Sequence, residues 1–201
     1  MTEALSRDFD INTLSVNDLV PQLCASASSR VSALVPEVLE LPGNIEEIPL
    51  PVGLDLIVSS STFQWFCDYA SSIHRMAEAL LPGGNLVFSL FSKGTMMQVR
   101  SLTGVGITYL SDEELLGPLK ADLDLLHFET VKHSLFFENP REVLRHIQDT
   151  GVSGVADFHW TVAALRRFER QYVERFGTMR GVSLDYVSRF VVARKKGRGQ
   201  S

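Results

Sequence analysis

The sequence predicts an α/β fold in which a mostly parallel, doubly wound sheet carries helices on both faces. Strand-like and helix-like segments alternate through the middle of the chain, as parallel α/β sheets require. The segment 54–60 is compact and contains the apolar run Leu56-Ile57-Val58, partly β-branched, which is typical of a strand covered on both faces. With 201 residues, 45% of them hydrophobic and 21% charged, the chain is large enough for one domain with a sizeable core.

Local signals place each element. A proline in its first turn favours a helix from Pro21, and a serine–glutamate capping box favours one from Ser111. The run 81–84, Leu-Pro-Gly-Gly, is expected to end the helix before it. The segment 183–194 alternates polar and apolar residues, and we expect it to be the final edge strand of an antiparallel hairpin. The predicted helices are 21–34, 69–81, 111–120, 140–150 and 161–176. The predicted strands are 12–17, 38–41, 54–60, 85–91, 125–137 and 183–194.

Composition narrows the class of protein. No apolar run reaches the roughly 18 residues that span a bilayer, and the polar N-terminus does not resemble a signal peptide. Cys24 and Cys67 lie far apart without metal-ligand spacing, so we expect no metal site and a reducing, cytoplasmic location.

The charge is distributed unevenly along the chain. From His159 to Ser201 there are ten Lys or Arg and three acids, a net charge of +7. The whole chain carries −5, so the first 158 residues carry −12. This pattern indicates either a solvated basic face or a docking surface for nucleic acid or an acidic protein. Nucleic acid is the weaker alternative, because the chain has no helix-turn-helix, RNP motif or basic-aromatic interleaving.

Five sequence blocks, taken in order, indicate a specific protein family. The first contains Ser59-Ser60-Ser61-Thr62-Phe63-Gln64-Trp65-Phe66, and the second contains Leu-Leu-Pro-Gly-Gly at 80–84. The blocks are 41–66, 80–89, 144–152, 168–172 and 186–195. In this order they resemble the malonyl-[acyl-carrier-protein] O-methyltransferase branch, used in biotin synthesis, of the class I S-adenosylmethionine-dependent methyltransferases. The resemblance covers about residues 14 to 196 and implies a Rossmann-like sheet.

The resemblance also implies a site for S-adenosylmethionine at the carboxyl ends of the strands. Asp18 matches the position whose carboxylate accepts hydrogen bonds from the ribose hydroxyls. Asn44, followed by Ile45, matches the adenine position, where the family often has aspartate. Ser59 and Ser60 follow the next strand, where methyl donor and acceptor meet. From the residues alone, Asp18 and Asn44 fit turn formation equally well.

For the substrate, the resemblance implies a malonyl group attached to acyl carrier protein, an acidic partner. Phe63 and Trp65 are candidates for pocket walls, although core packing also suits Trp65, and Gln64 is a candidate to orient a polar group. A carboxylate nucleophile needs no general base, so no catalytic residue is expected. It needs a cation, for which Arg145 is the candidate. The segment 139–182 is then a helical lid or docking insertion, with docking candidates Arg166, Arg167 and Arg170.

One departure from the family limits this assignment. Its members begin with a strand and a glycine-rich loop that lets the backbone approach the methionine part of the cofactor. Here the first glycine is Gly43, so we expect an incomplete domain with exposed strand edges and weak or no activity. A misplaced start, an inactive homologue or a strand supplied by another subunit would each explain this. The alternative functions are an inactive binder of acyl carrier protein and a methyltransferase for another small acceptor. The tail 197–201 is expected to be disordered.

Overall fold

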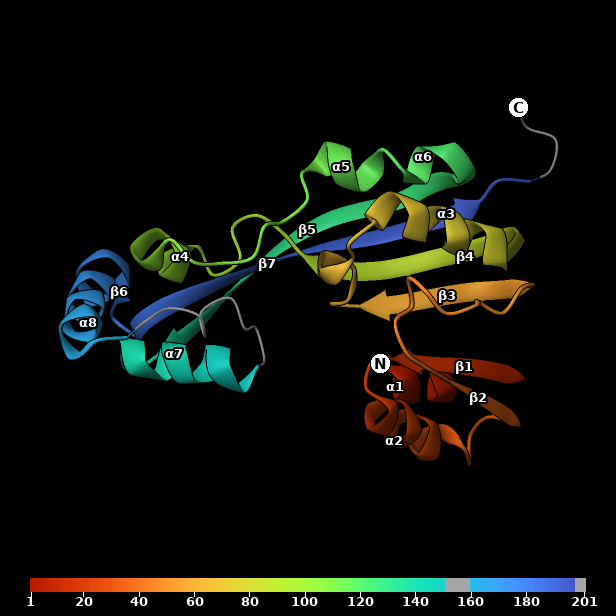
Figure 1. Ribbon diagram of the computed structural model, residues 1–201, viewed down its shortest axis with the longest axis horizontal. Helices are drawn as coiled ribbons and strands as arrows, with labels where there is room; N and C mark the ends of the chain where they lie inside the picture. The colour runs from red at the N-terminus through yellow and green to blue at the C-terminus, as the bar shows by residue number, and fades with distance from the viewer. Residues whose placement is uncertain (151–159, 198–201) are drawn as a thin grey trace. The chain divides into compact units, whose positions relative to one another are not determined.

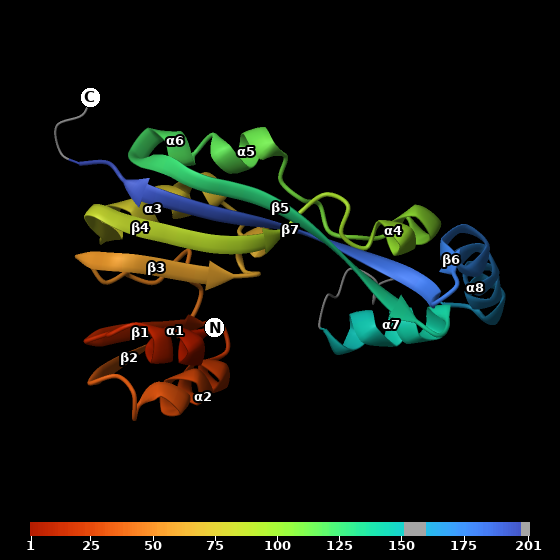
Figure 2. The same ribbon diagram turned by 180° about the vertical axis from the view of Figure 1, so that it is seen from behind.

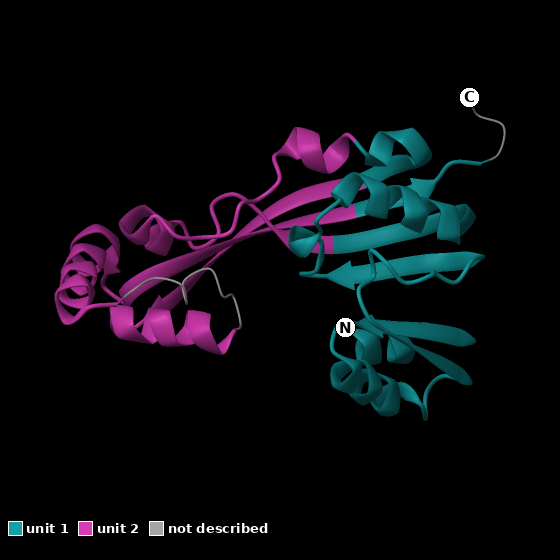
Figure 3. Cartoon of the chain, in the orientation of Figure 1, with its two compact units in different colours: residues 1–88, 118–126, 192–201 teal, residues 89–117, 127–191 magenta. Residues whose placement is uncertain are grey.

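The computed structural model describes residues 1–150 and 160–197. They form two compact units (Figure 3): unit 1 comprises residues 1–88, 118–126 and those from 192 onward, and unit 2 comprises 89–117 and 127–191. Strands β4, β5 and β7 contribute residues to both units. The predicted tail from 198 onward, and residues 151–159 of the predicted insertion, lie outside the described residues.

Unit 1 begins with a small layered structure that carries the predicted cofactor residues. Its elements are α1 (Thr2–Asp8), β1 (Thr13–Asp18), α2 (Pro21–Val31) and β2 (Glu37–Pro42). The two strands form a parallel pair in which Asp18 is opposite Pro42. Helix α2 packs on both strands and buries Cys24 and Val31 against them. The parallel pair therefore ends with both carboxyl termini at one edge.

The remaining strands form a five-stranded sheet in the order β3-β4-β7-β5, with β6 paired to β7 (Figures 1 and 2). Its strands are β3 (Leu54–Ser60), β4 (Leu80–Phe91), β5 (Leu123–Phe137), β6 (Gly177–Thr178) and β7 (Gly181–Lys195). The helices are η1 (Phe63–Trp65), α3 (Tyr69–Ala79), α4 (Met97–Thr103), α5 (Asp112–Leu116), α6 (Leu119–Asp122), α7 (Pro140–Asp149) and α8 (Val162–Phe176). This mixed architecture confirms the predicted α/β class.

Three details differ from the sequence-based prediction. Strand β4 begins at Leu80, five residues earlier than predicted. Gly83, with φ +83°, permits a bend inside the run 81–84, so this run is part of the strand and does not precede it. The helix predicted at 111–120 is divided into α5 and α6 at Pro118, which has no N–H to donate. Strand β7 is not an edge strand, because it lies between β4 and β5.

Among the described residues, five strands pair with a single neighbour: β1 and β2 pair with each other, β3 pairs with β4, and β5 and β6 pair with β7. Each presents one edge of backbone N–H and C=O groups that has no strand partner. The edges of β1 and β3 agree with the expectation of exposed strand edges. The side chain of Leu56 in β3 is also exposed.

Unit 2 has its own core, formed where α4, α7 and α8 pack around the first half of β7. The fully buried side chains include Tyr172, whose hydroxyl donates to the Ser183 carbonyl at 2.9 Å. The cluster comprises Met96, Val99, Val143, Ile147, Phe168, Tyr172, Val182 and Leu184. In the described part of the chain, no helix has the length and apolarity needed to cross a membrane.

A buried carboxylate also organises unit 2. Asp185 is 7% exposed, pairs with the Lys132 ammonium at 2.8 Å and accepts from the Ser134 hydroxyl at 2.6 Å. Burial alone would raise its pKa. The hydrogen bonds from Lys132, Ser134 and Gln98 outweigh burial and hold the pKa below its ordinary value. This carboxylate is therefore ionised and structurally engaged.

Candidate functional site

The carboxyl edge of the β1–β2 pair brings two predicted cofactor residues together. The Gly43 N–H donates to the Asp18 carbonyl at 2.9 Å. The Asn17 amide donates to the carbonyls of Leu41 at 2.6 Å and Gly43 at 3.0 Å. These bonds fix the turn that begins at Gly43 and carries Asn44 beside the end of β1.

Asp18 is half-buried at this edge. Its Oδ1 accepts from the Val20 N–H at 2.8 Å, which closes a turn leading into α2. Oδ2 has no hydrogen-bond partner in the described part of the chain. The turn-forming role is thus observed, and one oxygen remains for a donor such as a ribose hydroxyl. That second role stays a prediction.

Asn44 is engaged within its own turn. Its Oδ1 accepts from the Glu46 N–H at 3.1 Å, and its Nδ2 donates to the Glu47 carboxylate at 2.9 Å. The half-buried Ile45 offers its carbonyl to Arg75 Nη1 at 3.0 Å. The Asn44 side chain therefore shapes the turn, and its contact with adenine stays a prediction.

Two residues of this site were not found from the sequence. Glu46 accepts from the backbone N–H groups of Cys67 at 3.0 Å and Asp68 at 2.9 Å, at the start of α3. Arg75, also on α3, donates to the carbonyls of Ile45, Glu46 and Ile48. They are 29 residues apart, and no spacing rule connects them, so only the folded chain reveals the link.

The predicted substrate segment follows β3. Ser59 is half-buried and Ser60 exposed at the end of that strand. Phe63 is 1% exposed and stacks on Phe88 with ring centroids 4.3 Å apart, so it contributes to the core. Trp65 is 49% exposed and is therefore not a core residue. The roles of these residues as pocket walls stay predictions.

Gln64 carries an unsatisfied acceptor. Its Nε2 donates to the Ser61 carbonyl at 2.7 Å, while its Oε1 is buried and has no hydrogen-bond partner among the described residues. A buried acceptor without a partner costs about 1–3 kcal/mol, so a donor that reached it would be stabilised. For the cofactor, Asp18 Oδ2 is an acceptor and the ribose hydroxyls of S-adenosylmethionine are donors. This oxygen thus fits the ribose, although the sequence holds no glycine-rich loop near Asp18.

The other predicted residues belong to unit 2. Arg145 is exposed on α7, where the neighbouring Arg141 pairs with Glu169 of α8. On α8, the predicted docking residues Arg166, Arg167 and Arg170 are all exposed. In the described ranges, none of these three forms an ion pair or a side-chain hydrogen bond with the protein.

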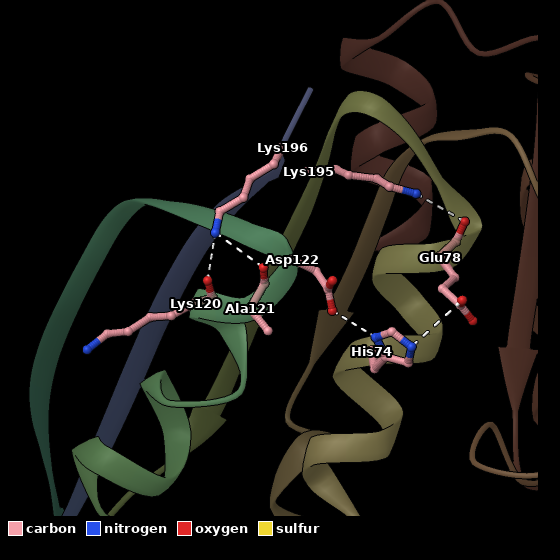
Figure 4. A network of polar contacts seen from close by, with 7 residues as sticks. All are labelled: His74, Glu78, Lys120, Ala121, Asp122, Lys195 and Lys196. Carbon is pink, nitrogen blue, oxygen red and sulfur yellow. Dashed lines mark hydrogen bonds and ion pairs between the residues drawn. The ribbon is translucent and has the colours of Figure 1, made fainter. Parts of the chain in front are cut away.

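Much of the remaining basic charge has a local structural role (Figure 4). In unit 1, Lys195 Nζ donates to the Glu78 and Leu80 carbonyls at the end of α3, at 3.2 and 2.6 Å. Lys196 Nζ donates to the carbonyls of Lys120 at 2.7 Å and Ala121 at 3.2 Å in α6. Cations at helix C-termini are favourable, because they satisfy carbonyls and oppose the helix dipole.

Basic side chains of unit 2 also have local partners, through an ion pair and cation–π contacts. Arg189 pairs with Asp112 at 2.5 Å. Arg175 and Arg180 lie over the rings of Phe176 and Phe136. Arg166, Arg167 and Arg170 therefore differ from the other described cations of the basic segment in having no such partner in the described structure.

Comparison with known proteins also indicates a methyltransferase. Residues 1–88 match the family model described as "Methyltransferase domain". The chain is 38% identical over 198 residues to the malonyl-[acyl-carrier protein] O-methyltransferase of Prosthecochloris aestuarii, covering 97% of this chain and 74% of that one. It is also 38% identical over 194 residues to the protein of that name from Bacteroides fragilis, covering 96% of this chain but only 39% of the longer relative.

Solved structures share the fold at low sequence identity. The YcgJ protein of Bacillus subtilis is 12% identical with a TM-score of 0.62, covering 98% of this chain and 99% of that one. The N-methyltransferase NodS of Bradyrhizobium japonicum, solved with S-adenosyl-L-homocysteine, is 14% identical with a TM-score of 0.50, covering 96% and 82%. The structural likeness, the family model and the 38% identity over nearly the whole chain show that this chain belongs to the malonyl-[acyl-carrier protein] O-methyltransferase family of class I methyltransferases.

Proposed function

We propose that the protein transfers a methyl group from S-adenosylmethionine to the free carboxyl of a malonyl group carried by acyl carrier protein, as in biotin synthesis. The observation that carries this proposal is the 38% identity over 198 residues to a relative named for that activity. The carboxyl edge of the β1–β2 pair supports S-adenosylmethionine as the cofactor, because the Asp18 carboxylate can accept a hydrogen bond from a ribose hydroxyl. Such a reaction belongs in the cytoplasm.

Methyl transfer requires alignment of the methyl donor with the nucleophile more than it requires acid–base groups. When bound, S-adenosylmethionine supplies a methyl group already activated by a positive sulfur. Asp18 holds the ribose, and the turn with Asn44 and Ile45 holds the adenine. Ser59 and Ser60 border the transfer region at the end of β3. The substrate carboxylate is itself the nucleophile, so no side chain has to remove a proton.

The segment after β3 then orients the acceptor. Gln64 Oε1 accepts a hydrogen bond from a polar donor, while Phe63 and Trp65 exclude water from the reacting atoms. The substrate carboxylate also needs a cation, and Arg145 of unit 2 stays the candidate because its planar pair of N–H donors matches a carboxylate.

Helix α8 is the docking surface for the acyl carrier protein. Arg166 and Arg170 are one helical turn apart, so they lie on the same face, and Arg167 flanks them. Val162 and Val173 extend this exposed face with apolar surface. Three available cations beside exposed valines suit an acidic, amphipathic helix, and this composition supports a protein partner over nucleic acid.

The test is product formation with purified components. The chain is incubated with S-adenosylmethionine and malonyl-acyl carrier protein, and the methyl ester is measured by mass spectrometry. A chain extended upstream of Met1 is tested in parallel, since the relatives are longer. If neither yields methyl ester, the proposed activity is wrong.

Charge reversal tests the docking surface and separates the alternatives. Arg166→Glu, Arg167→Glu and Arg170→Glu together should abolish binding of the carrier protein at low salt. Reversal of Arg30, an exposed arginine of α2, is the matched control and should leave binding unchanged. Binding without product would favour an inactive carrier-binding homologue, and product only with free small carboxylates would favour another acceptor. Unchanged affinity of the triple variant contradicts docking on α8.

A further inference from the structure

The turn 44–48 is attached to helix α3 by contacts that run in both directions. Glu46 reaches out of the turn and accepts three hydrogen bonds at the N-terminal end of α3. The donors are the backbone N–H groups of Cys67 and Asp68, which precede the helix, and the Ser72 hydroxyl in its first turn. Arg75 reaches out of the helix and donates to three carbonyls of the turn. Each element therefore binds the other through a charged side chain.

The Glu46 contact lies at the N-terminus of α3. Asp68 is the N-cap residue, and its own side chain accepts from the Ser71 N–H at 3.0 Å. Glu46 thus accepts the N–H of the capping residue and of the residue before it, where the helix dipole favours a negative charge. Because both Glu46 and Arg75 are half-buried, these charge-assisted bonds are partly protected from competing water.

The Arg75 contact lies farther along the same helix. Arg75 is seven residues after Asp68, which corresponds to roughly 10 Å along a helix axis. The turn is consequently held at two separated points, which fixes its orientation as well as its position. A guanidinium suits this role because its planar fork presents several N–H donors in fixed directions, whereas a lysine ammonium has a single centre.

We infer that Glu46 and Arg75 are positioning residues that set the cofactor turn against the substrate segment. The inference rests on the proposed function. The turn carries Asn44 and Ile45, and α3 begins four residues after Trp65, the last residue of the segment with Phe63 and Gln64. The side chains of Glu46 and Arg75 are occupied by the contacts between turn and helix. They therefore act through the backbone of the turn, so their loss should weaken cofactor affinity more than the methyl-transfer step.

The experiment uses the full chain with two conservative variants, Arg75→Lys and Glu46→Gln. Their matched controls are Arg30→Lys and Glu40→Gln, which change exposed residues of α2 and β2 in the same unit. Hydrogen exchange is measured by mass spectrometry on peptides covering 44–48 and 66–69. Affinity for S-adenosylhomocysteine is measured by calorimetry, and thermal unfolding reports whether each variant is folded.

Both variants should speed exchange in these two peptides about tenfold and weaken S-adenosylhomocysteine binding about tenfold, with controls unchanged. In an active chain, KM for S-adenosylmethionine should rise while kcat stays nearly constant. A purely structural role would lower the unfolding temperature without changing the affinity of the folded protein. Unchanged exchange, or faster exchange with unchanged affinity, overturns the inference.

Failure of the proposed function gives a different result. If the unmodified chain binds no S-adenosylhomocysteine, cofactor binding by this chain is wrong, and exchange alone decides the inference. Faster exchange in the two peptides of the variants then still supports a turn held by Glu46 and Arg75, while exchange equal to that of the controls refutes it.

Discussion

Replacing Asp18 with asparagine removes a negative charge from the carboxyl end of β1 and keeps a side-chain oxygen in place. That oxygen can still accept from the Val20 N–H, which Asp18 Oδ1 binds at 2.8 Å. Asp18→Asn therefore preserves the turn into α2, while an NH2 group, which donates and cannot accept, replaces the Oδ2 offered to a ribose hydroxyl. Asp18→Ala removes both, so comparing the two variants separates the local turn from the contact with the ligand.

The expected loss follows from the two kinds of hydrogen bond. The bond that a ribose hydroxyl donates to the Asp18 carboxylate contributes about 1.5–3 kcal/mol. In Asp18→Asn at most a neutral bond of about 0.5–1.5 kcal/mol replaces it, so the net loss is about 1–1.5 kcal/mol. A loss near 1.4 kcal/mol corresponds to about a tenfold higher Kd.

Calorimetric titration with S-adenosylhomocysteine measures this Kd, and urea unfolding measures the stability of each variant. Asp18→Asn should bind about tenfold more weakly with nearly unchanged stability. Asp18→Ala should also lose up to about 1 kcal/mol of stability, because the turn before α2 loses its acceptor. Equal affinity of the unmodified chain and Asp18→Asn would refute the ribose role, whatever the stability of the variants.

Three further predictions concern the scaffold. Tyr172→Phe should lower the free energy of unfolding by about 1–2 kcal/mol, because the buried Ser183 carbonyl loses its donor, and an unchanged urea midpoint would contradict this. The hydrogen bond that the His74 ring donates to the Asp122 carboxylate raises the pKa of His74, so this contact stabilises the fold below the ordinary histidine pKa and is lost as pH rises through the raised one. NMR titration of His74 should show a lower midpoint in Asp122→Asn. The lowered pKa of Asp185 gives stability that is present above the ordinary carboxyl pKa and lost as pH falls through the lowered one. Urea unfolding from pH 6 to pH 3 should show a smaller acid loss in Asp185→Asn, and an equal loss would argue against this carboxylate.

Local sequence signals predicted most elements because the signals themselves are local. The capping box at Ser111 forms as expected, with the Glu114 side chain returning to the Ser111 N–H at 2.8 Å. The apolar spacing of 69–81 correctly placed Ile73 and Met76 on the buried face of α3. The errors arose where one signal permits two outcomes. A glycine pair ends helices, yet Gly83 with φ +83° also permits a bend inside extended backbone.

The candidate site was predictable only in part, because strand topology places some of its residues and the packing of α3 places others. Asp18 ends β1 and Asn44 lies two residues beyond β2, and the carboxyl ends of parallel strands share one edge, so their proximity follows from topology. Glu46 and Arg75 meet because α3 packs beside the turn, and no local pattern encodes that packing. The burial of Phe63 was missed for the same reason, since its stacking partner Phe88 lies in a later strand.

The basic C-terminal stretch shows why a charge count overstates a docking surface. A net charge of +7 invites the interpretation that the whole segment attracts an acidic partner. Lys195 and Lys196, however, satisfy carbonyls of α3 and α6, and moving them to a partner would leave those carbonyls to water. Arginines that have no protein partner require no such exchange when a carboxylate arrives. The proposed docking surface is therefore better defined by cations without a structural role than by cations near one another in sequence. Among the described residues, Arg166, Arg167 and Arg170 of α8 meet that criterion.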